Sequence, residues 1–169
     1  MIHLATGILV QERRLLMVAS RYPNHPAPLW TLPGGRQLPG ELLAETVARE
    51  VLEETGVRAE AREVAYVSES YDRDEHYLNV TFVLEASFDS VRSARCAPDD
   101  TFDSARYAED DTRDHVVAVE WVPMEDVGER MTVAVVREPL IAYLRGELTQ
   151  RYAGFHEAGV TIQWPADSR

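Results

Sequence analysis

The chain has 169 residues and a net charge of −12, and 45% of its residues are hydrophobic, which excludes a disordered or fibrous protein. We expect residues 1–169 to form a single domain, because this length is enough to bury a core without disulfides or a structural metal. The single cysteine, Cys96, excludes an internal disulfide. The acidic charge argues against stable nucleic-acid binding, which needs clustered cations.

All 17 basic residues are arginine, so metal ions and arginines must supply the positive charge for any anionic substrate. The N-terminus has neither a basic region nor a long apolar stretch. No window reaches the roughly 20 apolar residues of a membrane helix. We therefore expect a cytoplasmic protein without a membrane partner, and leave open whether it is a monomer or a homodimer.

In chain order, hydrophobic runs at 4–10 and 15–19 predict two strands joined in a hairpin through a turn at 11–14. Three prolines predict an irregular loop over 20–28, because proline fixes φ and removes a backbone donor. A short strand at 29–32 then ends at a glycine pair that predicts a tight turn.

The most regular helical pattern spans 42–55, where apolar residues recur at helical spacing and Gly56 follows as a natural stop. Aliphatic and aromatic runs at 64–71 and 77–86 predict two strands of the same sheet, linked by the charged turn 72–76.

The remaining segment 89–114 is acidic and predicts a long, variable surface loop. Beyond it, the pattern predicts one more strand, a helix start, an amphipathic helix and a short closing strand, at 115–122, 123–127, 137–148 and 160–164.

Three glutamates share one side of the predicted helix, because Glu50, Glu53 and Glu54 are spaced i, i+3 and i+4. On a solvated face this crowding costs only about 0.2–0.5 kcal/mol for each pair, and the face has no further role. In a partly enclosed site, two carboxylates at about 4 Å repel by roughly 4 kcal/mol, and a divalent cation becomes the natural counter-charge. Oxygen ligands of this kind favour Mg²⁺ or Mn²⁺.

The sequence around these glutamates resembles the Nudix box, GX5EX7REUXEEXGU, in which U is a bulky aliphatic residue. Every fixed position is filled, by Gly35, Glu41, Arg49, Glu50, Val51, Glu53, Glu54, Gly56 and Val57. The resemblance implies an α/β (α+β) fold of the Nudix type, an α/β/α sandwich with a mixed sheet between helices.

The same resemblance implies a metal site and a division of roles. The expected ligands are the Gly34 carbonyl, the three helix glutamates and an additional glutamate that precedes a tryptophan, Glu120. The three helix glutamates and Arg49 form the expected catalytic set, in which Arg49 holds a glutamate in place, and Glu41 has a supporting role. Gly35 and Gly56 are expected as structural turns.

Several assignments stay open. The additional acidic ligand has competitors in the acidic loop, Glu109, Asp110, Asp111 and Asp114, and the general base is not fixed. Arginines suit phosphate and aromatic rings suit a base, so substrate contacts are expected from Arg21, Arg36, Arg73 and Tyr71. For each of them, charge balance or packing is the alternative. Other candidates, for stacking or hydrogen bonding, are Tyr77, Phe82, His25 and His76, whereas Trp30, Trp121 and Trp164 are expected to pack in the core.

The predicted function is Mg²⁺-dependent hydrolysis of a diphosphate bond, by water attack at phosphorus, with Mn²⁺ as a substitute ion. The resemblance implies a small nucleotide or nucleoside diphosphate derivative as substrate, and nothing in the box chooses among triphosphates, nucleotide sugars, dinucleoside polyphosphates and coenzymes. The alternatives are a Nudix-fold sensor that binds a nucleotide without turnover, and an acidic helix that serves only solubility.

Overall fold

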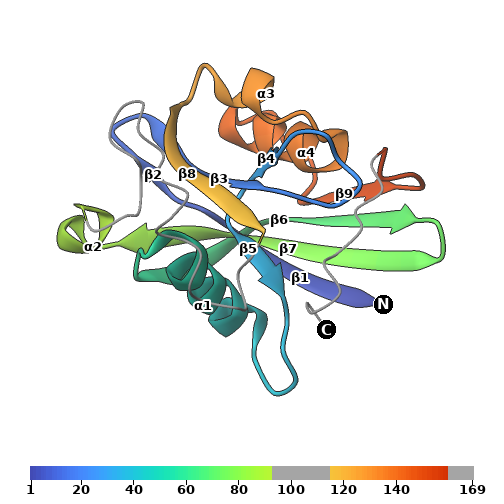
Figure 1. Cartoon of the computed structure of the whole chain (residues 1–169), viewed down its shortest axis with the longest axis horizontal. Helices are drawn as coiled ribbons and strands as arrows, with labels where there is room; N and C mark the ends of the chain where they lie inside the picture. The colour runs from blue at the N-terminus through green and yellow to red at the C-terminus, as the bar shows by residue number, and fades with distance from the viewer. Residues whose placement is uncertain (93–114, 160–169) are drawn as a thin grey trace.

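The computed structural model describes residues 1–92 and 115–159. These residues form two sheets that lie between helices on opposite sides (Figure 1). The larger sheet has the strand order β5-β1-β7-β6-β9, and it is mixed, since β1 runs parallel to β7 and β6 parallel to β9. Its strands are β1 (Ile2–Ile8), β5 (Gly34–Arg36), β6 (Ala59–Asp72), β7 (Glu75–Ala86) and β9 (Tyr152–Phe155).

In the smaller, antiparallel sheet β3 is central: it pairs with β2, β4 and β8. These strands are β2 (Val10–Gln11), β3 (Arg14–Ser20), β4 (Leu29–Thr31) and β8 (Val116–Pro123). The helices are α1 (Leu43–Thr55), α2 (Phe88–Arg92), α3 (Val127–Arg130) and α4 (Ala134–Leu144). Figure 1 shows α1 on one side of the sheets and α3 and α4 on the other, so the expected α/β/α sandwich with a mixed sheet is confirmed.

Alternating residues of β3 connect the two halves of the core. Leu16 and Val18 pack in the cluster that contains Val47 and Val51 of α1. The residues between them, such as Met17, pack in the cluster that contains α3 and α4. Because both faces of β3 are covered, the strand is a continuous apolar run without polar alternation.

The hairpin expected between 4–10 and 15–19 forms only around its turn, between the short strand β2 and β3. A turn at Glu12 and Arg13, both with positive φ, joins β3 to the two-residue strand β2. The longer β1 instead pairs with β5 and β7 in the other sheet, so the chain crosses between sheets near Leu9.

Other differences concern short or glycine-containing elements. Strands β5 and β9 were not predicted, since each has only three or four residues and contains glycine. α2 lies at the start of the expected loop 89–114, and the rest of that loop, with its four acidic candidates, falls outside the described residues, as does the expected strand 160–164.

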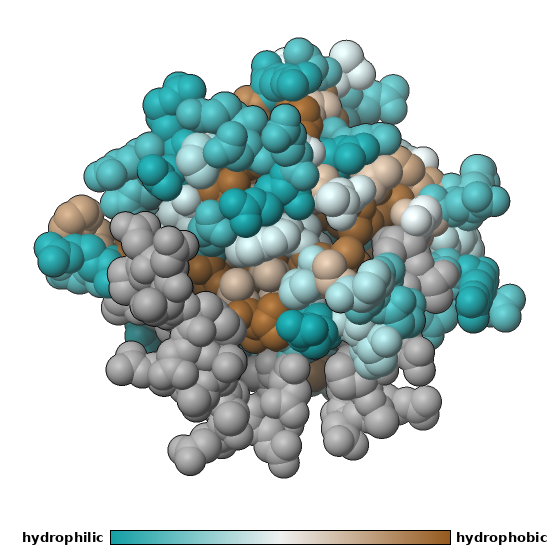
Figure 2. Space-filling view, turned by 45° about the horizontal axis from the view of Figure 1, so that its top comes forward, coloured by the Kyte–Doolittle hydropathy of each residue, from teal (hydrophilic) through white to brown (hydrophobic). Residues whose placement is uncertain are grey.

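The expected helix start near 123–127 lies one turn before α3, and α4 covers 134–144 instead of 137–148. No helix in the described part of the chain has the length and apolar character to cross a membrane. Hydrophilic side chains cover much of the face seen in Figure 2, with apolar residues showing near its centre.

Candidate active site

The helix α1 is held in register at both ends. At its start the Leu42 N–H donates to Glu45 Oε2 at 2.8 Å. At its end Gly56 adopts a left-handed conformation with φ of 76°, and its N–H bonds to the Leu52 carbonyl. Val47 and Val51 are fully buried, which fixes the rotation of the helix and therefore the side on which its glutamates lie.

Arg49 connects the acidic residues of this region. Its guanidinium donates to both oxygens of Glu41, at 2.6 and 3.0 Å, to Glu50 at 2.8 Å and to Glu53 at 3.2 Å. It also donates to the carbonyl of Arg36 on β5, at 3.1 Å. One planar cation thus fixes two helix glutamates and ties them to the neighbouring strand.

Glu41 is the most strongly anchored of these carboxylates. The hydrogen bonds from Arg49, assisted by those from the Leu38 N–H and the Thr46 hydroxyl, lower the pKa of Glu41 to about 2. Glu41 therefore remains charged and serves to hold Arg49, in agreement with a supporting role.

Glu54 is the buried member of the helix face, and Glu50 is half-buried. Glu54 is 7% exposed, and its Oε2 accepts the Gly34 N–H at 2.8 Å. Burial raises the pKa of Glu54 well above its ordinary value, and the charges of Glu50 and Glu53 raise it further. Burial also raises the pKa of Glu50, although Arg49 opposes the shift. A buried group of like charges is costly, and a cation would offset that cost.

The donor set therefore has the chemistry of a divalent metal site, with carboxylate oxygens and a nearby backbone carbonyl. In the described ranges 1–92 and 115–159, however, no three acidic, histidine or cysteine side chains lie close enough to hold one ion. Glu54 turns toward Gly34, and Glu50 toward Arg49. An ion between them would take the place of these protein donors.

The glycine pair lies in β5 at the edge of the sheet, so the predicted tight turn at Gly35 is wrong. Gly34 has a φ of 148°, and a Cβ there would lie 2.2 Å from the Ala5 carbonyl oxygen. A Cβ on Gly35 would lie 2.6 Å from the carboxyl carbon of Glu50. The two glycines thus allow the backbone of β5 to run directly against the carboxylates of α1.

Glu120 lies apart from the three helix glutamates. Its carboxylate accepts two hydrogen bonds from Arg130 of α3, at 3.1 and 3.2 Å, and the Arg130 guanidinium carbon lies 4.8 Å from the centre of the Trp30 ring. The preceding residue, Val119, packs in the cluster of α1, and strand alternation therefore turns Glu120 to the opposite face.

The expected substrate residues are not gathered in one place. Arg21 is exposed in the loop that follows β3, and Arg36 lies on β5 next to the site. Tyr71 stacks on His76 with ring centres 4.3 Å apart, and with Arg73 it borders a shallow hollow at the tip of β6 and β7. Among the other candidates, Trp30, Phe82 and Trp121 pack against the core, His25 contacts the ring of Tyr22, and Trp164 lies outside the described residues.

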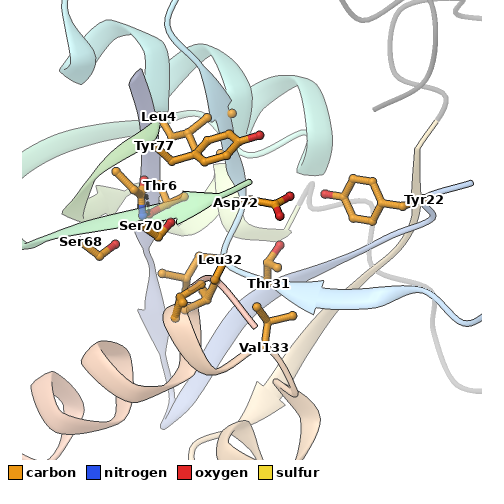
Figure 3. Close-up of a pocket in the computed structure, with 16 residues that line it drawn as sticks. Leu4, Thr6, Tyr22, Thr31, Leu32, Ser68, Ser70, Asp72, Tyr77 and Val133 are labelled. Carbon is orange, nitrogen blue, oxygen red and sulfur yellow. Dashed lines mark hydrogen bonds between the residues drawn. The ribbon is translucent and has the colours of Figure 1, made fainter. Parts of the chain in front are cut away.

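A cavity of about 150 Å³ opens beside Gly34 and Gly35, between the two sheets and the start of α4 (Figure 3). Of the expected candidates within the described residues, apart from the glycines, only Tyr77 lines the cavity. Sequence reasoning missed the rest of its polar lining, which comes mainly from Thr6, Tyr22, Ser68, Ser70, Asp72 and Asn79. The signal was present in β6, where polar residues alternate at 68, 70 and 72 as on one face of a strand.

In this arrangement one arginine orders the glutamates of a helix, which packs against a glycine-rich strand beside a cavity. The NUDIX domain family matches residues 1–144, and the chain belongs to this family. Diphosphoinositol polyphosphate phosphohydrolase 2 of Rattus norvegicus is 36% identical over 89 residues, which are 50% of this chain and 48% of the relative. ADP-ribose pyrophosphatase of Methanocaldococcus jannaschii is 29% identical over 112 residues, 64% of this chain and 65% of the relative.

The chain thus spans less than two thirds of the length of either relative. Among solved structures, a NUDIX hydrolase from Nitrosomonas europaea is similar with a TM-score of 0.64 and 22% identity. The similarity covers 89% of this chain and 91% of that one, and it supports the fold.

Proposed function

We propose that the chain hydrolyses a diphosphate bond in a nucleoside diphosphate derivative or nucleotide, by attack of water at phosphorus. The observation that carries this proposal is the acidic face of α1, where the buried Glu54 and the half-buried Glu50, both with raised pKa, lie beside Arg49 and the backbone of β5. A solubility face would be solvated, whereas Glu54 is almost completely buried.

The proposed ligands for Mg²⁺, with Mn²⁺ as a substitute, are Glu50, Glu53, Glu54 and the Gly34 carbonyl. When bound, the ion supplies charge stabilisation for phosphoryl oxygens and lowers the pKa of water. Glu120, the additional ligand expected from the sequence, is not included in this set, because Arg130 donates to both of its oxygens.

The protein's own residues provide orientation. Arg49 holds Glu50 and Glu53 in fixed directions, and the Gly34 N–H holds one oxygen of Glu54, which leaves its other oxygen to take a proton from water. The glycines of β5 would allow a diphosphate to approach the backbone closely, because neither residue has a side chain of its own that projects from the strand.

The test is a hydrolysis screen with Mg²⁺ and with Mn²⁺, in which phosphate release is measured after phosphatase or pyrophosphatase is added. The relatives' names supply two substrates, ADP-ribose and a diphosphoinositol polyphosphate. A nucleoside triphosphate, a nucleotide sugar and a dinucleoside polyphosphate complete the panel. Cleavage that requires the metal supports the proposal. No cleavage of any compound, together with nucleotide binding, would favour a sensor.

We also propose that residues 1–169 act as one domain in the cytoplasm, as a monomer or homodimer. The single cysteine and the acidic charge agree with a reducing compartment and a small-molecule partner. Size-exclusion chromatography with light scattering distinguishes the two assemblies.

A further inference from the structure

The cavity beside β5 has two kinds of wall. Leu32 and Val133, at the end of β4 and the start of α4, form an apolar side. Thr6, Ser68 and Ser70 of the larger sheet form a polar side that faces it in Figure 3. Such a cavity fits a ring with apolar faces and a hydrogen-bonding edge.

The size of the cavity limits what enters it. A space of about 150 Å³ is comparable to cavities that hold a single six-membered ring such as benzene. It is too small for a ring that carries several phosphate groups.

The charge of the lining leads to the same conclusion. Among the described residues that border the cavity, none is an arginine or a histidine, and Asp72 is the one charged side chain. Phosphate groups are bound in proteins by cations and backbone donors, and a carboxylate at short range repels them.

Asp72 is placed to meet the edge of an enclosed ring. Figure 3 shows its carboxylate pointing toward the phenol of Tyr22 on the other side of the cavity, with Thr31 near both. Burial raises the pKa of Tyr22 to about 12, so its hydroxyl keeps its proton and can donate. A carboxylate acceptor and a phenol donor thus face each other across the cavity.

Tyr22 also connects the cavity to the carboxylates of α1. It is 6% exposed and lines the cavity together with Gly34, whose N–H donates to Glu54 Oε2 at 2.8 Å. If the diphosphate of a substrate binds at α1, the group attached to that diphosphate would lie in the cavity, beside Tyr22 and Asp72.

We propose that this cavity receives one uncharged ring of the substrate, a base or a sugar, and that Asp72 is a specificity-determining residue. Its carboxylate accepts hydrogen bonds from donors on that ring and disfavours rings that carry several phosphate groups. The inference rests on the proposed function, since it assigns the group next to the diphosphate.

The test compares Asp72→Asn with Asp74→Asn in the full-length chain. Asn keeps the shape of the side chain and removes its charge. Asp74 is a matched control, because it lies two residues further along in the exposed turn and does not line the cavity. Kinetics with ADP-ribose and a diphosphoinositol polyphosphate, in Mg²⁺, give KM and kcat separately. Equilibrium binding of AMP, ribose 5-phosphate and inorganic phosphate needs no turnover.

We expect the wild-type chain to cleave ADP-ribose with a higher kcat/KM than the diphosphoinositol polyphosphate. Asp72→Asn should raise the KM for ADP-ribose about tenfold, the order of one charge-assisted hydrogen bond, with kcat within about twofold. It should also lower the ratio of kcat/KM for ADP-ribose to kcat/KM for the diphosphoinositol polyphosphate. Asp74→Asn should match the wild type. Stronger binding of AMP than of ribose 5-phosphate identifies the ring as the base, and the reverse identifies it as the sugar.

Three results would overturn the inference. They are equal behaviour of the two variants in both assays, a wild-type preference for the inositol compound, and binding of AMP and ribose 5-phosphate no tighter than that of inorganic phosphate. If no compound is cleaved but Asp72→Asn still weakens AMP or ribose 5-phosphate binding, the proposed hydrolysis fails and the assignment of the cavity stands.

Discussion

Substitution of Gly35 by alanine separates the role of β5 in the site from its role in the fold. The new Cβ would lie 2.6 Å from the carboxyl carbon of Glu50 and at 2.6 and 2.8 Å from its oxygens. Ordinary contacts begin at about 3.4 Å. The carboxylate must therefore retreat by roughly 1 Å, and a displacement of this size in a catalytic group can cost about 100-fold in rate.

The fold should tolerate this change, because the clash involves the end of a side chain and not the backbone. We expect kcat of Gly35→Ala to fall about 100-fold while Tm drops by only a few degrees, where 1 kcal/mol corresponds to about 2–4 °C for a domain of this size. Gly34→Ala is the contrasting variant: its Cβ would meet the Ala5 carbonyl at 2.2 Å with φ at 148°, and Tm should fall much further.

The assay is a steady-state measurement on whichever panel substrate is cleaved, together with thermal melting of both variants. Gly128→Ala is the control, because the nearest atom to its Cβ would be an Ile141 methyl carbon at an ordinary 3.7 Å. Full activity in Gly35→Ala, or a loss of Tm as large as that of Gly34→Ala, would refute the placement of Glu50 against β5.

Two further predictions concern the glutamates themselves. Mg²⁺ at about 100 times its Kd should stabilise the wild-type chain by about 2.7 kcal/mol. Glu53→Gln should lose this stabilisation and most turnover, whereas Glu120→Gln should retain both. Equal shifts of Tm on addition of Mg²⁺ in all three proteins would contradict the ligand assignment. Glu41 has a pKa lowered from 4.5 to about 2, so its stabilising effect is present above pH 4.5 and is lost as the pH falls toward 2. Glu41→Gln should therefore be less stable than the wild type by about 1–2 kcal/mol at pH 7 in denaturant unfolding, and a difference that does not shrink below pH 4.5 would show that charge is not the cause.

Local patterns predicted α1 almost to the residue, because its apolar spacing and the stop at Gly56 depend only on neighbouring positions. The pairing of β1 was not predictable in the same way. Leu4 lies beside Asn79, and no short-range pattern indicates a partner 75 residues away. The two-sided burial of β3 similarly conceals which sheet it joins, since every face of the strand is apolar.

In the site, too, the features within one helix were predictable, and the contacts between distant segments were not. The three glutamates belong to one helix, so their spacing alone predicted that they would share a face. The partners that orient them, the Arg36 carbonyl and the Gly34 N–H, come from β5, which the sequence did not reveal as a strand. Glu120 was assigned from its tryptophan neighbour, and its pairing with Arg130 depends on the packing of α3.

The glutamate site and the cavity are two adjacent parts of the molecule, and the two proposals assign the reaction to the first and substrate selection to the second. The glutamates of the site lie on α1 against β5. The cavity is lined by residues of β1, β4, β5, β6, β7 and the start of α4, together with Tyr22 and Ala158. Tyr22 belongs to both parts, because it borders the cavity and the charge of Glu54 contributes to its raised pKa. Substitutions at Ser68, Ser70 or Asp72 therefore change the lining without moving a glutamate of α1. Under the two proposals, the helix motif specifies the bond that is cleaved, and the lining of the cavity specifies the substrate group next to that bond.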